Sequence, residues 1–174
     1  MAAMLMGAWS LQSCDNEPTK EVWLDEFGQD SCYVQDWGML EVNRSVVHTP
    51  LTVNGVVYER GLGAHSISRL LYDLDGKAVS ISGLAGADDK NLFAGKLQFK
   101  ILGDKKELWK SGVMQKGDPV KEFNVNLKGV DKVLLLVEEC GDGIMYDHAD
   151  WLNVKFVTRG EIIPIPAWPK PVAK

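Results

Sequence analysis

The chain has 174 residues, of which 45% are hydrophobic and 25% are charged, a composition typical of a globular protein with one domain of ordinary size. Its formal net charge at pH 7 is −5, and no run of Lys and Arg is longer than two residues. Binding to phosphates needs a basic face, so these values argue against a nucleic-acid partner.

Residues 1–20 resemble a bacterial lipoprotein signal followed by a short tether. The apolar, uncharged stretch 1–11 is too short to span a bilayer but long enough for the hydrophobic part of a signal peptide. The sequence Leu11-Gln12-Ser13-Cys14 resembles a lipobox, in which Cys14 would receive the lipid. We therefore predict an exported bacterial lipoprotein, at the outer membrane or cell surface. The alternative is a disordered chain end.

Residues 21–160 are predicted to form one all-β domain. The first clear signal is a hairpin over residues 51–58, in which Asn54-Gly55 joins two β-branched runs. Apolar and polar residues then alternate over 96–101, 122–128 and 152–156, and residues 133–137 are continuously apolar. A period of two indicates strands with one wet and one buried face. Such short strands, separated by polar turns, predict an antiparallel β-sandwich or jelly roll.

The C-terminal residues 161–174 are rich in proline and are predicted to be a linker or tail. Four prolines occur between positions 163 and 171. Proline fixes the backbone and removes a hydrogen-bond donor, so the segment should be stiff and extended.

Apart from Cys14, the chain holds two cysteines, Cys32 and Cys140. In an exported protein this pair could form a disulfide, or it could remain as two separate buried thiols. A zinc site formed by both cysteines with His65 and His148 is not expected, because no closely spaced ligand pair is present.

Polar and aromatic residues suited to recognition gather in three segments between the expected strands, at 35–38, 58–66 and 141–151. Loops held on a rigid sandwich are a common place for binding sites. A Trp offers a flat platform for the C–H face of a sugar, whereas carboxylate, amide, guanidinium and imidazole groups bind its hydroxyls. The candidate carbohydrate-binding residues are Gln35, Trp37, Glu59, Arg60, His65, Asp147, His148 and Asp150.

Several of these side chains also have structural interpretations. Trp151 begins an alternating strand and is assigned to the core, whereas exposure and burial are equally compatible with the context of Trp37. His65 alone would fit a satisfied structural histidine. Arg60 beside Glu59 would fit a surface ion pair of little energetic value.

Five motifs in order resemble carbohydrate-binding module family 51, over residues 22–158. They are Trp37-Gly38, the segment 58–66 (YERGLGAHS), Gly86-Ala87-Asp88-Asp89, Leu108-Trp109-Lys110-Ser111-Gly112, and Asp147-His148-Ala149-Asp150-Trp151. The resemblance implies a β-sandwich that binds terminal galactose or related glycans and a companion glycoside hydrolase, commonly an α-galactosidase. It also implies a structural calcium ion, for which Asp88 and Asp89 are the candidate ligands. Ala64 and Ser66 differ from the usual family residues beside His65 and leave the exact sugar open.

Two other functions compete with this interpretation. A spacer that joins a hydrolase to the membrane without binding sugar would pack Trp37 and His148 inside. A small glycoside hydrolase would use Glu59 or Asp147 as general acid with a second carboxylate. The sequence offers no clear second carboxylate for that pair, so the module itself is predicted to be non-catalytic.

Overall fold

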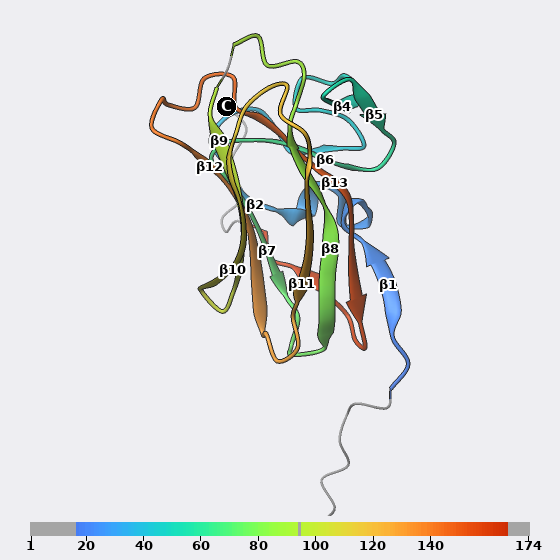
Figure 1. The fold of residues 1–174 in the computed structure, drawn as a ribbon. Helices are drawn as coiled ribbons and strands as arrows, with labels where there is room; N and C mark the ends of the chain where they lie inside the picture. Colours follow the sequence, from blue (N-terminus) through green and yellow to red (C-terminus); the bar gives the residue numbers. More distant parts are fainter. Residues whose placement is uncertain (1–16, 94, 167–174) are drawn as a thin grey trace, which may run out of the picture.

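The alternating strands pair into two antiparallel sheets packed face to face in the computed structural model (Figure 1). The structure describes residues 17–93 and 95–166. Within those residues the first sheet has six strands, in the order β11 (Lys121–Asn126), β8 (Ala78–Ala87), β13 (His148–Thr158), β6 (Gly61–His65) and β3 (Glu41–Val42), with β1 (Lys20–Trp23) on β13. One edge of β13 is shared: its first half pairs with β6 and its last half with β1.

The second sheet likewise has six strands among the described residues. Its order is β10 (Lys106–Met114), β9 (Leu97–Gly103), β12 (Lys132–Glu139), β7 (Ser68–Asp73) and β14 (Ile163–Pro164), with β2 (Cys32–Gln35) also on β7. A separate hairpin consists of β4 (Leu51–Val53) and β5 (Val56–Tyr58), and a 3-10 segment, η2 (Leu24–Ser31), follows β1. These strands confirm the predicted all-β sandwich.

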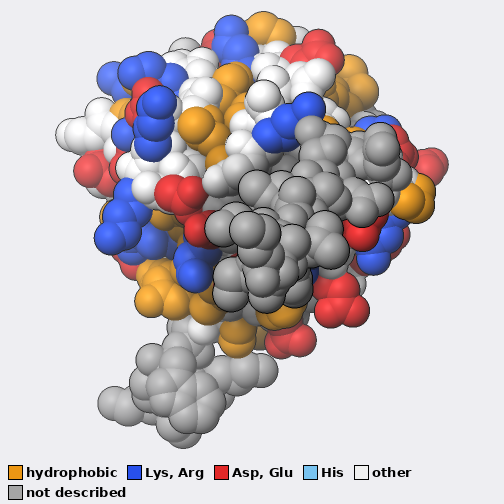
Figure 2. Space-filling model, turned by 90° about the horizontal axis from the view of Figure 1, so that it is seen from below, with side chains coloured by type: hydrophobic (Ala, Val, Ile, Leu, Met, Phe, Trp, Pro, Cys, Tyr) orange, Lys and Arg blue, Asp and Glu red, His pale blue; other side chains and the backbone are white. Residues whose placement is uncertain are grey.

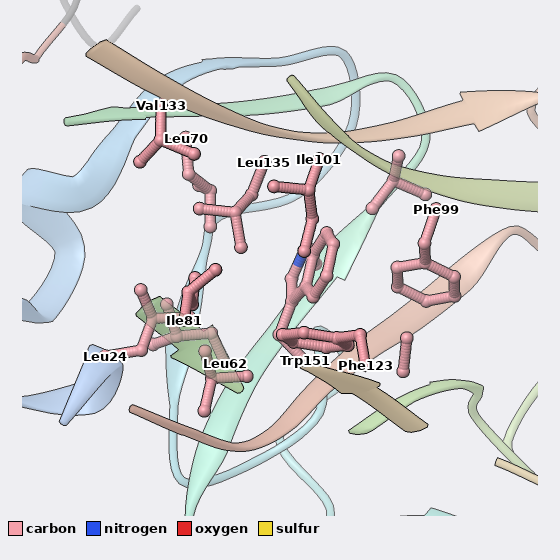
Figure 3. Close-up of a cluster of buried hydrophobic side chains, with 14 of the residues drawn as sticks. Leu24, Leu62, Leu70, Ile81, Phe99, Ile101, Phe123, Val133, Leu135 and Trp151 are labelled. Carbon is pink, nitrogen blue, oxygen red and sulfur yellow. The ribbon is translucent and has the colours of Figure 1, made fainter. Parts of the chain in front are cut away.

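The hydrophobic core fills the space between the two sheets (Figure 3). Trp151 of β13 is fully buried, as predicted, and meets Phe99 of β9 and Phe123 of β11 edge to face at ring-centroid distances of 4.9 and 5.7 Å. Edge-to-face contacts place the positive ring edge on the negative ring face and add to the benefit of burial. This cluster ties the two sheets together, since Phe99 belongs to one and Trp151 to the other.

The predicted hairpin at residues 51–58 is confirmed as β4 and β5. Asn54 and Gly55 have φ values of 48° and 76°, the left-handed pair that a tight two-residue turn requires. The carboxylate of Asp89 accepts hydrogen bonds from both turn amides, at 3.0 Å from Asn54 and 2.7 Å from Gly55. The hairpin is therefore fastened to the end of β8.

The two ends of the sandwich differ. At the upper end in Figure 1, β2, β6 and β8 end, β13 begins, and the connections 43–50, 88–96 and 140–147 lie close together. Backbone hydrogen bonds join Ser66 to Asp147 and Asp88 to His148 there. The opposite end, seen in Figure 2, carries acidic and basic side chains interspersed with hydrophobic ones.

Two predictions concern the ends of the chain. Cys14 and the proposed signal segment lie outside the described residues. The described part of the proline-rich segment forms β14 at the edge of the second sheet, where a Pro without an N–H is tolerated, and the Ile165 amide donates to Leu71. Among the described residues, no helix has the length and hydrophobicity needed to cross a membrane.

Candidate functional site

Strand register brings two predicted site residues together. His65 is the last residue of β6 and His148 is the first of β13, and the two are direct partners in the ladder. Their ring centroids lie 5.5 Å apart. Two histidines more than eighty positions apart in the chain thus form one wall at the upper end of the sandwich.

Trp37 completes an aromatic cluster with these histidines. Its ring lies 5.8 Å from that of His148, at an interplanar angle of 8°, and 4.9 Å from that of His65. The Gln35 amide holds the loop, because its nitrogen donates to the Trp37 carbonyl and its oxygen accepts from the His65 amide. Trp37 is 48% exposed, so its side chain is accessible to a ligand and not packed inside.

A pocket of about 500 Å³ opens beside this cluster. Seven residues line it: Trp37, Val47, His65, Ile144, Met145, Tyr146 and His148. None carries a carboxylate, ammonium or guanidinium group. The apolar wall formed by Val47 and residues 144–146 was not predicted, since these residues lie in irregular connections without periodicity. The only sequence signal was the position of Tyr146 in the segment 141–151.

Burial favours the neutral form of the two pocket histidines, because it lowers the pKa of both His65 and His148. His65 Nδ1 lies 2.6 Å from the Ser66 carbonyl oxygen, which can only accept, so Nδ1 carries the proton. The other ring nitrogen, Nε2, is then an acceptor for a hydroxyl group. The backbone of His148 is held by Asn91, whose side-chain oxygen and nitrogen bond its amide and carbonyl at 2.9 and 3.0 Å.

Asp147 lies behind the pocket rather than on its wall. Its side chain is fully buried, and one carboxylate oxygen accepts a hydrogen bond from the Ser66 hydroxyl at 2.5 Å. The other oxygen has no hydrogen-bond partner within the described structure. Burial raises the pKa of Asp147 to about 6, against the effect of the Ser66 bond. Asp147 supports the pocket by joining two of its loops.

Glu59 and Arg60 are separated from the pocket. They precede Gly61 at the start of β6, whereas His65 lies at its end, about 16 Å away at the usual strand rise. The Arg60 guanidinium contacts the Asp25 carboxylate at 3.0 Å and lies 4.3 Å from the centroid of the Trp23 ring. Glu59 and Asp147 are therefore not brought together as an acid and base pair.

Asp150 is also buried and does not line the pocket. Burial, followed by the charge of the neighbouring Asp88 carboxyl and a side-chain interaction with it, raises the pKa of Asp150 well above the ordinary value, and no other group in the described part of the chain donates a hydrogen bond to its oxygens. Asp88 is fully buried as well and accepts from the Lys90 amide at 2.7 Å. Of the two predicted calcium ligands, Asp89 instead bonds the β4–β5 turn.

Two buried carboxyl groups side by side offer oxygen ligands of the kind that a hard cation takes. If the calcium ion implied by the sequence motifs is bound here, Asp88 and Asp150 would be the carboxylates that hold it, because Asp89 is engaged by the β4–β5 turn. The described residues contain no group of three or more His, Cys, Asp and Glu side chains arranged for a metal. Further ligands would have to be carbonyl oxygens or water.

Gly63 allows the 43–50 connection to reach the pocket. A Cβ at this position would lie 2.3 Å from the Arg44 carbonyl oxygen and 2.6 Å from the Ser45 Cα. The absence of a side chain lets this connection pack directly on β6 and bring Val47 to the pocket wall. Gly63 thus shapes the site through packing.

Cys140 does not line the pocket. Cys140 is a free, partly buried thiol whose pKa is raised by burial. This finding favours separate thiols over the disulfide alternative.

An antiparallel sandwich with an aromatic pocket on the loops at one end defines a small-ligand-binding module. The chain belongs to the NPCBM/NEW2 domain family, whose model matches residues 20–157. Alpha-1,3-galactosidase B of Akkermansia muciniphila is 29% identical over 130 residues, which cover 72% of this chain. The chain spans 16% of the length of that protein and 10% of a second curated relative, from Renibacterium salmoninarum.

Two solved structures extend the comparison. The CBM51 domain of Clostridium perfringens GH95, in complex with methyl-galactose, matches with a TM-score of 0.70 and 25% identity over 79% of this chain and 99% of that one. The M60 catalytic domain with the CBM51-1 and CBM51-2 domains of Clostridium perfringens ZmpB matches with a TM-score of 0.72 and 28% identity, over 81% of this chain and 15% of that one. These matches confirm the family and fold expected from the sequence motifs.

Proposed function

We propose that this carbohydrate-binding module is non-catalytic and binds terminal galactose, or a closely related neutral sugar, in the pocket beside Trp37. The observation that carries the proposal is the exposed Trp37 ring next to two neutral histidines. The methyl-galactose bound to the similar Clostridium perfringens domain supports it.

The chemistry of galactose suits such a pocket. Its axial 4-hydroxyl leaves three C–H groups on one face of the ring, a continuous apolar patch that can stack on an indole. Its hydroxyls can then donate to the free Nε2 of His65 and bond the ring of His148. Glucose lacks that apolar patch, so the same pocket should bind it less well. The lining has no charged group, which favours a neutral sugar over an anionic one.

The binding should be weak, because an open pocket leaves part of a monosaccharide in water. We expect dissociation constants in the millimolar to high-micromolar range, about 4 to 6 kcal/mol. Tight retention on a glycan surface would then depend on several copies or several sites.

Calorimetric titration with methyl galactoside, N-acetylgalactosamine and glucose tests the proposal. Heat from the galactosides, with weaker or no heat from glucose, is the expected result. Trp37→Ala should weaken binding at least tenfold, on the order of 1.4 kcal/mol, through loss of the stacking surface. The control is Trp23→Ala, which removes another Trp that lies beneath Arg60 instead of beside the pocket. If no sugar produces heat or changes Trp37 fluorescence, the spacer function is favoured.

Three parts of the proposal concern what surrounds the sugar site. We propose that the module targets a linked or associated glycoside hydrolase, since a relative is an α-1,3-galactosidase. We propose calcium as a structural ion held by Asp88 and Asp150, on the strength of their paired burial. Anchoring through Cys14, at an outer membrane or cell surface, rests on the lipobox-like sequence.

A further inference from the structure

An aromatic pair continues the pocket wall outward. Tyr146 lines the pocket, and its ring meets that of Phe93 edge to face at a centroid distance of 4.9 Å. Phe93 belongs to the 88–96 connection and is 66% exposed, while Met145, on the pocket wall next to Tyr146, is 72% exposed. Large apolar side chains are therefore presented to solvent directly beside the site.

The backbone of Tyr146 is held in an unusual conformation. Its φ is 65°, in the left-handed region that few non-glycine residues adopt. Strained residues of this kind concentrate at binding sites, where surrounding contacts hold them in place. Here the contact with Phe93 joins the 140–147 and 88–96 connections and leaves the Phe93 side chain largely uncovered.

The pocket is larger than one sugar ring. A hexose has about 12 non-hydrogen atoms, which would fill about 360 Å³ even at the ~30 Å³ that a water molecule occupies in the liquid. The pocket measures about 500 Å³. A ring bound beside Trp37 thus leaves room in the pocket, whose wall also includes Met145 and Tyr146.

We propose that Phe93, Tyr146 and Met145 form a second subsite, which binds the sugar unit joined to the terminal galactose. This inference rests on the proposed function and deepens it, because it makes the ligand an oligosaccharide. The second ring is covalently linked to the first. Most of the entropy cost of placing it beside Phe93 is therefore already included when the first ring binds. Stacking on an exposed aromatic side chain should then tighten binding by about two- to tenfold.

The test compares methyl galactoside with three disaccharides that carry galactose at the non-reducing end, linked β1,3, β1,4 or α1,3. Calorimetry on the unmodified protein should show at least one disaccharide binding two- to tenfold more tightly than methyl galactoside. Phe93→Ala should abolish this gain without changing the affinity for methyl galactoside. Phe93→Trp should keep it. The control is Ile163→Ala, since Ile163 is 57% exposed on β14 at the opposite end of the sandwich.

Equal binding of methyl galactoside and all three disaccharides would overturn the second subsite while leaving the galactose site intact. A disaccharide gain that survives Phe93→Ala would overturn it too. The unmodified protein could instead self-associate in sedimentation experiments, show no disaccharide gain, and lose the self-association with Phe93→Ala. That result would overturn the subsite and assign the exposed side chains of Phe93, Tyr146 and Met145 to a contact between copies of the protein. Failure of the unmodified protein to bind methyl galactoside or any disaccharide would refute the proposed function together with this inference.

Discussion

The buried carboxyl of Asp147 should make stability depend on pH in a defined direction. Burial raises its pKa from 3.8 to about 6, so the folded state holds this proton more tightly than the unfolded chain does. The free energy of unfolding should therefore fall as the pH rises from about 4 to about 6, and level off above that range. A difference of about two pKa units corresponds to about 3 kcal/mol at most.

Asp147→Asn isolates this effect. The amide keeps the shape of the side chain and an oxygen that can accept from the Ser66 hydroxyl, but it does not ionise. At pH 7.5 the variant should be more stable than the parent protein by about 2 kcal/mol, and the two should converge near pH 4. Urea denaturation from pH 4 to 8 in the presence of a chelator, followed by Trp fluorescence, measures the difference.

Glu122→Gln is the control, since it removes an exposed carboxylate on β11 that does not contribute to the pKa of Asp147. Its stability should follow that of the parent protein within about 0.5 kcal/mol at every pH. A difference between Asp147→Asn and the parent that does not change with pH would refute the reasoning. A variant that is less stable at pH 7.5 would mean that the ionised carboxylate stabilises the fold.

Two further perturbations test the neighbourhood of the pocket. Chelation should lower the melting temperature of the parent protein and of Asp89→Asn, but hardly that of Asp150→Asn, because the proposed ion needs the buried carboxylate beside Asp88. Differential scanning fluorimetry measures these shifts. Equal shifts in all three proteins would contradict this assignment. Gly63→Ala should destabilise the fold by about 2 kcal/mol or more and weaken sugar binding, because its Cβ would displace the backbone at Arg44. If Gly63→Ala leaves the melting temperature and the sugar affinity unchanged, the 43–50 connection can move to accept the added methyl group, and the argument from close packing is wrong.

The sheets could be predicted because their signals are local. Alternation over 96–101 and 122–128 predicts strands with one wet and one buried face. This is confirmed, because burial alternates along β9 from Leu97 to Gly103 and along β11 from Phe123 to Asn126. The Asn54-Gly55 turn likewise depends only on adjacent residues. The 3-10 segment η2 was missed, since it is short and kinked at Gly28 (φ 62°).

The site could be predicted only in part, because its assembly depends on long-range register. His65 and His148 face each other through the β6–β13 ladder, whose register cannot be read from either strand alone. Every residue of β6 is buried, so its sequence has no alternation to show which way His65 points. Arg60 lies in the same motif as His65, yet an extended strand separates the two.

Residue chemistry alone also does not distinguish the pocket surface from the layer behind it. Asp147, His148 and Asp150 are close neighbours in one motif, but only the histidine lines the pocket. Asp147 joins Ser66, and Asp150 lies beside Asp88, so both carboxylates belong to the supporting layer. Because the carboxyl groups of Asp147 and Asp150 lie in that layer, a ligand in the pocket would contact the Trp37 indole, two imidazoles and an apolar wall. A charged ligand would lose its hydration there without gaining a counter-charge, which is the physical reason for proposing a neutral glycan end as the ligand.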